Sequence, residues 1–245
     1  MLTKFENITL PEKLGELLIP HLDYTNLDEK GTEKDIQHLC ERASATKPFV
    51  AAVCVFPHFV KQCKDLLIAL PIKIATVINF PQGNDPLETS CTMIEESLHH
   101  GANEIDLVLP YQTFLQGDFK KVGAYLQNCA SITKPHAQLK VILETGELKT
   151  ASAIRDASFL ALDCGADFLK TSTGKVPIGA SLEAAEVMLQ AIKKMGSPAG
   201  FKASGGVKTP REAYEYFLLT ETILEKKPTA ALFRIGASRL LDELS

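Results

Sequence analysis

The chain alternates between short apolar runs and longer amphipathic stretches. Eight apolar runs cover residues 17–25, 49–56, 72–80, 103–110, 139–145, 166–172, 199–206 and 231–236. Segments with a helical pattern lie between them, for example 32–44, 85–101, 147–165 and 181–196, and a short one, 237–245, ends the chain. Strands that alternate with helices predict βα units and a parallel sheet.

Eight such units favour a closed (β/α)8 barrel, the TIM-barrel fold of the α/β class, over an open sheet. A doubly wound open sheet is the alternative, and a GxGxxG motif after the first strand would favour it, but that motif is absent. A barrel holds about 250 residues in one unit, and no linker divides this chain, so we expect one catalytic domain over 1–245. The first residues, about 2–15, predict an extra helix that covers the bottom of the barrel.

Composition and charge narrow the function. The formal net charge is −4 and the pI is about 5.9, which argues against a nucleic-acid binder but not against a site for a small anion. The N-terminus lacks the pattern of a signal peptide, and no apolar run reaches ~18 residues, so we expect no membrane span. The six cysteines are scattered without CxxC spacing, which indicates reduced thiols in a cytoplasmic protein.

Catalytic residues of a barrel lie at the C-terminal ends of its strands, and this rule singles out Asp23, Thr25, Cys54, Asp106, Lys170 and Lys202. A lone lysine at a strand end is often a surface residue. Lys170 and Lys202, however, end neighbouring strands, so each would disfavour the other's positive charge, and burial would add to that effect. An uncharged lysine is a nucleophile toward carbonyls. Asp106 beside the two amines suits proton transfer.

Glycine-rich turns follow the late strands, in TSTGK (171–175), SGGVK (204–208) and IGAS (235–238). Turns of this kind at helix N-termini hold phosphate, and the loops after strands 7 and 8 are the usual phosphate site of barrels. One such turn is a weak signal, but three after successive strands predict a phosphorylated substrate.

These motifs together resemble the deoxyribose-phosphate aldolases, a family of class I aldolases on a (β/α)8 barrel. The similar segments extend over essentially the whole chain: LDYTNL (22–27), VCVFP (53–57), TVINFPQG (76–83), EIDLVLPY (104–111), ILETGEL (142–148), DFLKTSTGK (167–175), FKASGGVKT (201–209) and FRIGAS (233–238). The segments DFLKTSTGK and KASGGV are the most specific of them.

The resemblance implies reversible cleavage of 2-deoxy-D-ribose 5-phosphate to D-glyceraldehyde 3-phosphate and acetaldehyde in deoxynucleoside catabolism, without a metal or organic cofactor. It implies a Schiff base on Lys170, whose pKa Lys202 lowers. Asp106 would carry protons through an ordered water, and Asp23 would complete the relay. The predicted substrate contacts are Thr25, Cys54, Thr173, Gly174, Lys175, Gly205, Gly206, Gly236 and Ser238. For Cys54, a buried structural role is the simpler interpretation.

Two departures from the family pattern stand out. Many members carry a longer C-terminal tail that ends in a tyrosine, whereas this chain stops at LLDELS, so that role is vacant or taken by water. The family often has two serines after the final GA, whereas Ser238 is followed here by Arg239. The second departure puts the usual phosphate contact at 239 in doubt or replaces it with a cation.

Three other functions compete with this interpretation. A metal-dependent aldolase is disfavoured because the six histidines show no HxxxH or HxH spacing. Another phosphosugar-handling barrel enzyme, such as an isomerase, needs a carboxylate base but not two neighbouring lysines. A non-catalytic sugar-phosphate-binding protein has no need of Lys170, Lys202 and Asp106 together. A homodimer is compatible with this kind of barrel, although the sequence carries no interface signature.

Overall fold

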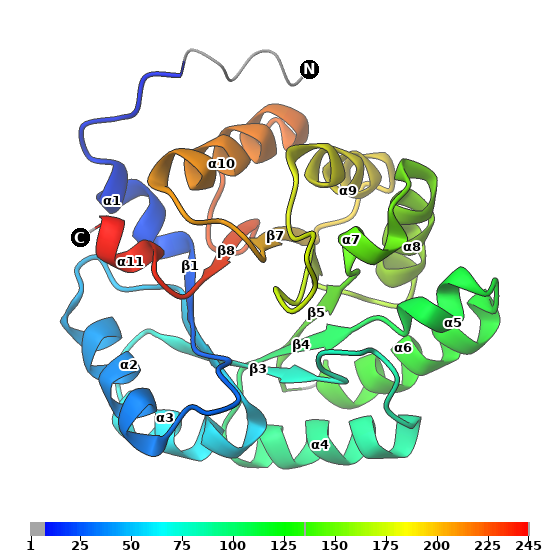
Figure 1. Cartoon of the computed structure of the whole chain (residues 1–245), viewed down its shortest axis with the longest axis horizontal. Helices are drawn as coiled ribbons and strands as arrows, with labels where there is room; N and C mark the ends of the chain where they lie inside the picture. Colours follow the sequence, from blue (N-terminus) through cyan, green and yellow to red (C-terminus); the bar gives the residue numbers. More distant parts are fainter. Residues whose placement is uncertain (1–7, 135, 245) are drawn as a thin grey trace.

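The computed structural model describes residues 8–134 and 136–244 and shows a closed barrel of eight parallel strands (Figure 1). Each strand pairs with the next along the chain, and β8 pairs with β1 to close the barrel. The strands are β1 (Leu22–Thr25), β2 (Ala52–Val55), β3 (Lys73–Ile78), β4 (Glu104–Val108), β5 (Gln138–Ile142), β6 (Phe168–Lys170), β7 (Gly200–Ser204) and β8 (Phe233–Ala237). The predicted (β/α)8 barrel is confirmed.

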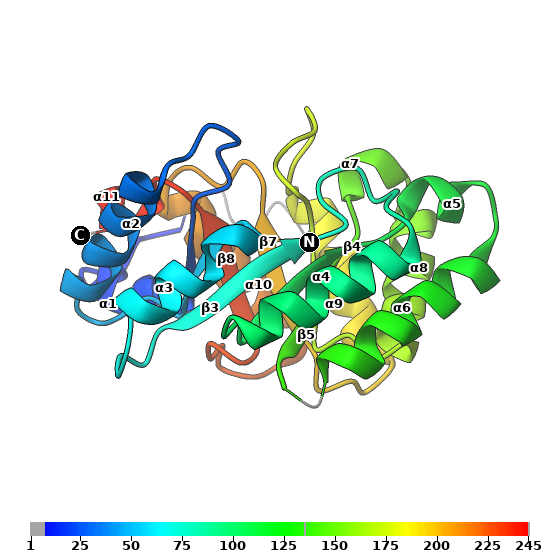
Figure 2. The ribbon, with the colours of Figure 1, turned by 90° about the horizontal axis from the view of Figure 1, so that it is seen from below.

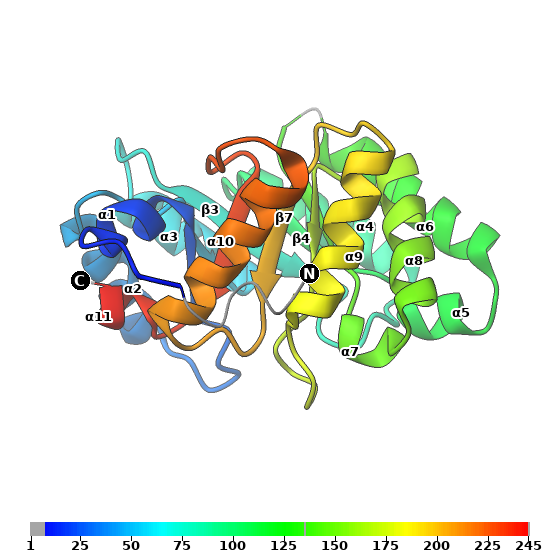
Figure 3. The same cartoon turned by 90° about the horizontal axis from the view of Figure 1, so that it is seen from above.

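Helices surround the strands, and the views from below and above show them as an outer layer (Figures 2 and 3). The α-helices are α1 (Leu14–Leu18), α2 (Glu33–Ala45), α3 (Val60–Leu66), α4 (Leu87–His99), α5 (Tyr111–Leu115), α6 (Phe119–Thr133), α7 (Thr145–Leu148), α8 (Ala151–Asp163), α9 (Leu182–Lys194), α10 (Pro210–Leu224) and α11 (Leu240–Leu244). Two 3-10 turns, Ile19–His21 and Pro57–Phe59, precede β1 and α3. Within the ranges that the structure describes, no helix is both long and apolar enough to cross a membrane.

Side-chain caps mark where several of these helices begin. The Thr32 hydroxyl accepts a hydrogen bond from the Asp35 N–H, and the Asp35 carboxylate accepts one from the Thr32 N–H, which forms a capping box at α2. Thr209 and Glu212 form the same box at α10. Because the caps satisfy N–H groups that lack an intrahelical partner, they define helix starts close to where the sequence predicts them.

The predicted N-terminal helix over about 2–15 is wrong in its extent. Residues 1–7 lie outside the described residues, and the described part is helical only from Leu14 to Leu18. Pro11 explains why no helix extends through residues 8–10, because proline disfavours the helical conformation of the residue before it and lacks an N–H donor. The short helix packs beside α10 and α11.

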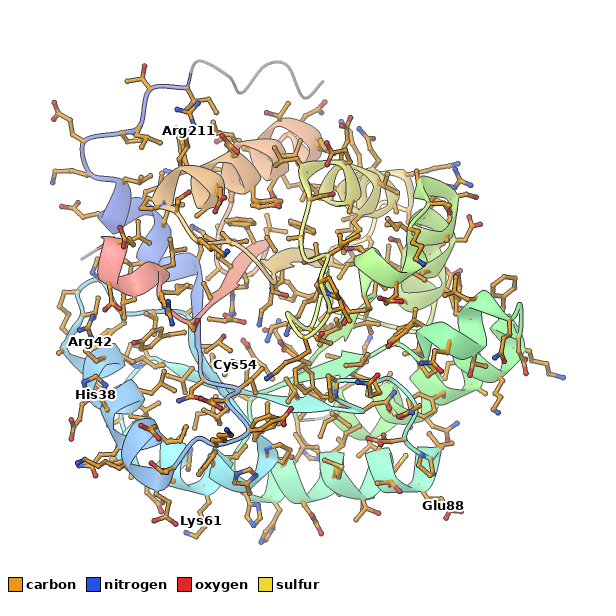
Figure 4. The ribbon with its side chains drawn as sticks, viewed as in Figure 1. His38, Arg42, Cys54, Lys61, Glu88 and Arg211 are labelled. Carbon is orange, nitrogen blue, oxygen red and sulfur yellow. The ribbon has the colours of Figure 1, made fainter. Side chains whose placement is uncertain are left out.

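Alternate residues of each strand face two different environments. One set packs against the helices in a continuous apolar core that includes Ile105, Val141 and Leu169. The other set points into the barrel, where β2 and β3 contribute small apolar residues and the remaining strands contribute charged ones. Cys54 belongs to the small apolar set and lies near the centre of the barrel in Figure 4. The site is therefore built from inward-facing side chains.

Candidate active site

Lys170 and Lys202 lie side by side inside the barrel. The two residues are register partners on β6 and β7, as their places at the ends of neighbouring strands predict. The Lys170 Nζ contacts Asp106 Oδ2 at 2.8 Å, and the Lys202 Nζ contacts the same oxygen at 2.7 Å. All three side chains are buried. The structure thus brings together the two amines and the carboxylate that the sequence singled out.

A second carboxylate, Asp23 on β1, joins this group from the other side of Lys202. Its Oδ2 lies 2.5 Å from the Lys202 Nζ. Asp23 is fully buried, and its backbone carbonyl accepts a hydrogen bond from the Thr25 hydroxyl at 2.7 Å. Lys202 is therefore held between two carboxylates, whereas Lys170 contacts one carboxylate that it shares.

Three further charged residues, which the sequence reasoning missed, complete the cluster. Lys140 on β5 donates to Glu104 at 2.5 Å and to Asp106 Oδ1 at 2.8 Å. Arg234 on β8 donates to Asp23 Oδ1 at 2.7 Å and to Glu104 Oε1 at 2.8 Å. Glu104 begins β4, and Lys140 and Arg234 lie inside β5 and β8, so the rule that singles out the C-terminal ends of strands passes over all three. Their inward parity, which Glu104 shares with Asp106 two residues later, is the signal that could have found them.

These contacts close into a ring of alternating charge. In order around it, the members of this charged ring are Arg234, Asp23, Lys202, Asp106, Lys140 and Glu104. The ring holds three cations and three carboxylates, and Lys170 is attached to it from outside through Asp106. Among the described residues, the only buried side-chain N or O atom without a hydrogen-bond partner is Gln62 Oε1, so the ring leaves none unpaired.

The protonation states follow from burial and from these partners. Burial works to raise the pKa of Asp106 and Asp23, but the surrounding cations outweigh it and hold both pKa values below the ordinary range. Burial works to lower the pKa of Lys202 and Lys140, but their carboxylate neighbours outweigh it and raise both values. These four ring members are therefore charged at neutral pH.

Lys170 behaves differently from the other two lysines. Burial lowers its pKa, Asp106 opposes this, and the positive charge of Lys202 lowers it further, so that the net shift is downward. The cause that the sequence predicted, a neighbouring lysine plus burial, is present, with burial the larger part. An amine with a lowered pKa is uncharged in a larger fraction of molecules and is the better nucleophile toward a carbonyl.

Glycines turn the backbone in the loops that follow β6 and β7. Gly174, Gly205 and Gly206 all have positive φ angles, of 79°, 82° and 92°. A Cβ at Gly205 would approach Gly174 Cα to 3.2 Å, whereas a Cβ at Gly206 would meet nothing within 4 Å. The two turns therefore pack glycine against glycine and leave the backbone of Gly206 accessible.

Gly236 has a different place from the other predicted phosphate contacts. It lies inside β8, and a Cβ there would approach Lys202 Cε to 3.1 Å and Ser204 Cβ to 2.9 Å. The lack of a side chain at 236 thus makes room for the stem of Lys202. Ser238 follows β8 and is exposed.

The segment between β6 and α9 reaches over the open end of the barrel, and it projects beyond the strands in the side view (Figure 2). The Lys175 Nζ, on this segment, donates to the Leu27 carbonyl at 2.8 Å, which joins it to the loop after β1. Thr173 is buried, and its hydroxyl donates to Glu144 Oε2 at 2.5 Å. Lys175 and Thr173 therefore lie at the same end of the barrel as Lys170.

Glu144, after β5, is a buried residue that the sequence reasoning did not single out. Its backbone adopts the left-handed conformation, with φ 55° and ψ 61°, which is costly for a residue other than glycine. Besides the Thr173 hydroxyl, its carboxylate accepts the Thr173 N–H at 3.3 Å. Burial raises the pKa of this carboxyl, although the contacts with Thr173 and the charge of Lys170 oppose the rise.

Cys54 and Arg239 complete the predicted set. Cys54 is fully buried, and burial raises the pKa of its thiol, so the simpler interpretation of a small buried side chain fits the geometry. Arg239 is exposed and precedes α11. Asp242, three residues further along the chain, is paired with Arg42.

A hollow of about 700 Å³ lies away from this cluster, where the chain enters β4 and β5. Its lining includes Lys64, His99, Asn103 and His136, and none of its lining residues is a predicted site residue. In a barrel this is the end opposite the catalytic loops. Within residues 8–134 and 136–244, no group of three or more His, Cys, Asp or Glu side chains is placed to hold a metal ion.

Comparison with known proteins identifies the family. Residues 17–225 match the profile described as DeoC/LacD family aldolase. The deoxyribose-phosphate aldolase of Agrobacterium fabrum (strain C58 / ATCC 33970) is 43% identical over 236 residues, which are 96% of this chain and 91% of the relative. The chain belongs to the DeoC/LacD aldolase family.

Solved structures of aldolases agree with this membership. The deoxyribose phosphate aldolase from Aeropyrum pernix, described as tetrameric, is 29% identical, with a TM-score of 0.76 over 94% of this chain and 90% of its own. An aldolase designated QR15 is 29% identical, with a TM-score of 0.78 over 92% of this chain and 95% of its own. The resemblance seen in the sequence is thereby confirmed at the level of the family.

Proposed function

We propose that this aldolase reversibly cleaves 2-deoxy-D-ribose 5-phosphate to D-glyceraldehyde 3-phosphate and acetaldehyde, through a Schiff base on Lys170. The substrate is supported by the 43% identical relative, which is named for it. The observation that carries the mechanism is the shared contact of Lys170 and Lys202 with Asp106 Oδ2. It places an amine of lowered pKa beside a carboxylate able to move protons.

The uncharged Lys170 amine attacks C1 of the open-chain sugar, and the resulting carbinolamine loses water to form the imine. Removal of the proton from the C3 hydroxyl then breaks the C2–C3 bond. Its electron pair moves into the imine to give an enamine, and C3 leaves as the aldehyde of glyceraldehyde 3-phosphate. Protonation of the enamine at C2 and hydrolysis of the imine release acetaldehyde and restore the amine.

Asp106 is proposed to carry protons during these steps, through an ordered water, because it contacts the reacting amine directly. Asp23 completes the relay through Lys202, which it contacts at 2.5 Å. Thr25 and Cys54 line the substrate side in this proposal. Lys202 keeps its positive charge and disfavours a second one on Lys170.

The phosphate is proposed to bind where the loops after β6, β7 and β8 meet. Thr173, Gly174 and Lys175 come from the first loop, Gly205 and Gly206 from the second, and Ser238 from the third. The positive φ angles of the glycines turn the backbone at these positions, and the open space beside Gly206 admits an anion to its N–H. Gly236 acts in this site through the room it leaves for Lys202.

We also propose a cytoplasmic location, a role in deoxynucleoside catabolism and a homodimeric state. All six cysteines are free thiols, five of them buried, which suits a reducing compartment. Size-exclusion chromatography with light scattering tests the dimer, and a tetramer, as named for the Aeropyrum pernix relative, would overturn it.

The test is to incubate the protein with acetaldehyde and borohydride and to map the reduced adduct by mass spectrometry, alongside turnover of 2-deoxyribose 5-phosphate. We expect one adduct, on Lys170, and loss of both adduct and turnover in Lys170→Met. A Lys193→Met variant, which removes a surface lysine paired with Glu225, is the matched control and should retain both. An adduct on Lys202, or turnover without any adduct, would contradict the proposal.

A further inference from the structure

Arg234 and Glu104 close the charged ring on the side away from Lys170. Arg234 is 4% exposed and Glu104 1% exposed, and neither contacts Lys170 in the described structure. Arg234 bridges Asp23 Oδ1 and Glu104 Oε1, and Glu104 Oε2 holds the Lys140 Nζ at 2.5 Å. Arg234 and Glu104 thus connect Asp23, which contacts Lys202, to Lys140, which contacts Asp106.

The orientation of Arg234 is determined by contacts on several sides. Its Nε donates to the carbonyl of Ala230, and its guanidinium carbon lies 5.6 Å from the centre of the Phe168 ring. Phe168 is itself confined, because a Cβ at Gly200 would lie 2.3 Å from its ring. Arg234 therefore presents its two terminal nitrogens to two carboxylates in one arrangement.

Burying ion pairs inside a barrel costs free energy, because each charged group loses its hydration. Replacing a buried ion pair by apolar residues of similar size is often neutral or stabilising. The outward neighbours of Arg234, Phe233 and Ile235, are fully buried apolar residues, so the strand accepts apolar side chains readily. Stability alone thus gives a weak account of Arg234 and Glu104, and the effect of their charges on the site has to be considered.

The number of acidic and basic groups inside the barrel shows how these charges affect the site. Seven ionisable groups contact one another inside the barrel, and three of them are carboxylates whereas four are cationic when protonated. Along the ring, each carboxylate lies between two cations and each cation between two carboxylates, and the Lys140 Nζ also lies 3.6 Å from Asp23 Oδ2 across it. Lys170 has no place in this alternation and meets only Asp106, which two ring lysines already contact.

We propose that Arg234 and Glu104 are positioning residues of the aldolase site, which complete a charge-balanced ring and so leave Lys170 as the one surplus amine. This inference rests on the proposed function, in which Lys170 forms the imine. It extends that function by assigning the choice between the lysines to residues that do not touch the reacting atoms. Without Arg234 the ring would need Lys170 as its third cation.

The other ionisable groups around Lys170 do not change this balance. Lys202, its register partner on β7, and Asp106 on β4 belong to the ring, as does Lys140, which precedes its register partner on β5, Ile142, by two residues. Cys54 faces it from β2, and burial raises the pKa of this thiol, which favours its neutral form. Glu144, at the end of β5, is held by the hydroxyl and the N–H of Thr173. Among the described residues, the ion pair of Lys170 is with Asp106, so neither group is a matching carboxylate partner for it.

The experiment measures how the capture of acetaldehyde on Lys170 depends on pH, by cyanoborohydride reduction and peptide mapping. N-acetyl-lysine amide in the same tube corrects for the pH dependence of the reagent. Arg234→Met removes a cation, so Lys170 should keep its proton to a higher pH, with the midpoint raised by roughly one pH unit. Glu104→Gln removes an anion and keeps a similar shape, so the midpoint should move downward.

The double variant Arg234→Met/Glu104→Gln restores equal numbers of ring cations and carboxylates. We expect its midpoint within a few tenths of a pH unit of the wild type, although each single change shifts it in an opposite direction. Arg234→Lys should also stay near the wild type, because it keeps the charge. Arg42→Met removes an arginine from the surface pair with Asp242, at the rim of the molecule in Figure 4, and should leave the midpoint unchanged.

Midpoints that move in the same direction in both single variants, or that do not move, would overturn the charge-balance role. If Arg234→Met fails to fold, Glu104→Gln and the double variant decide, because the proposal requires a downward shift in the first and its reversal in the second. An adduct that maps to a residue other than Lys170 in the wild type would contradict the proposed function instead. The two failures are therefore distinguishable.

Discussion

Leu169 and Lys170 are neighbours on β6 but belong to two different regions of the molecule. Leu169 points outward into the apolar core between strands and helices and is fully buried. Lys170 points into the barrel and contacts Asp106. The same alternation holds on β7, where Phe201 packs outward and Lys202 faces the ring, and on β8, where Phe233 and Ile235 flank Arg234.

The outer region stabilises the barrel by removing apolar surface from water, at roughly 25 cal/mol per Å². The inner region works against that gain, because each buried charge loses its hydration and needs partners. A parallel strand buried on both faces is usually apolar throughout. The comparison teaches that outward-facing strand residues contribute to stability and inward-facing ones to chemistry. Single substitutions at neighbouring residues of one strand should therefore affect one property without the other.

The largest effect is expected inside the barrel, for Lys170→Met. The other two buried lysines, Lys140 and Lys202, are each paired with ring carboxylates and cannot replace the Lys170 amine. Turnover should therefore fall by on the order of 10⁴–10⁶-fold, the scale for removing a covalent nucleophile. Because Lys170 is the surplus amine and lies outside the charge-balanced ring, the free energy of unfolding should not fall. Denaturant titration checks stability, and a marked loss of stability would contradict the charge count.

Asp106→Asn should produce the next largest effect, a loss of roughly 10²–10⁴-fold, the usual contribution of a general acid–base group. The measurement is enzyme-catalysed exchange of deuterium from D₂O into the methyl group of acetaldehyde, which reports proton transfer at the enamine. Asp65→Asn, which removes a surface partner of Lys61, is the control. Exchange at the wild-type rate in Asp106→Asn would confine Asp106 to a structural role.

Leu169→Ala tests the outer region. It leaves a cavity in the apolar core, so the free energy of unfolding should fall by about 2–5 kcal/mol, while turnover per folded molecule stays within about twofold. Leu169→Met, with a similar volume, should cost under about 1.5 kcal/mol. Equal losses of activity in Leu169→Ala and in the Asp106 variant would mean that the two faces are not separable.

The smallest effect is expected for Arg239→Ser. Arg239 is exposed, and an exposed charge contributes little, so KM for the phosphorylated sugar should rise only about two- to fivefold. KM for free 2-deoxyribose should not change, because it has no phosphate to contact. An equal change for both sugars, or none for either, would show that Arg239 does not contact the phosphate.

Much of this architecture could be predicted from the sequence because it depends on local patterns. Alternating apolar runs and amphipathic segments predicted the barrel. The strand-end rule singled out Lys170, Lys202, Asp106 and Asp23 and predicted that the two lysines lie close together, and the family resemblance added Asp23 to their group. The extent of the N-terminal helix was wrong. The roles of the site residues, and the single catalytic domain over the whole chain, remain predictions.

The ring itself could not be predicted in the same way. Lys140 lies on β5, next to the strand of Asp106, and Arg234 lies on β8, next to the strand of Asp23. Their contacts depend on the register and stagger of the closed barrel. Glu144 depends on a left-handed backbone conformation that its sequence context does not reveal. The placement of Gly236 against Lys202 likewise requires two strands to be paired first.

The most direct test of the account is the pH at which Lys170 of the wild-type protein reacts. The account requires this buried amine to lose its proton more readily than an ordinary lysine, whose pKa is about 10.4. Capture of acetaldehyde on Lys170, corrected with N-acetyl-lysine amide, should therefore reach its midpoint below that value. A midpoint at or above the ordinary lysine value would contradict the account.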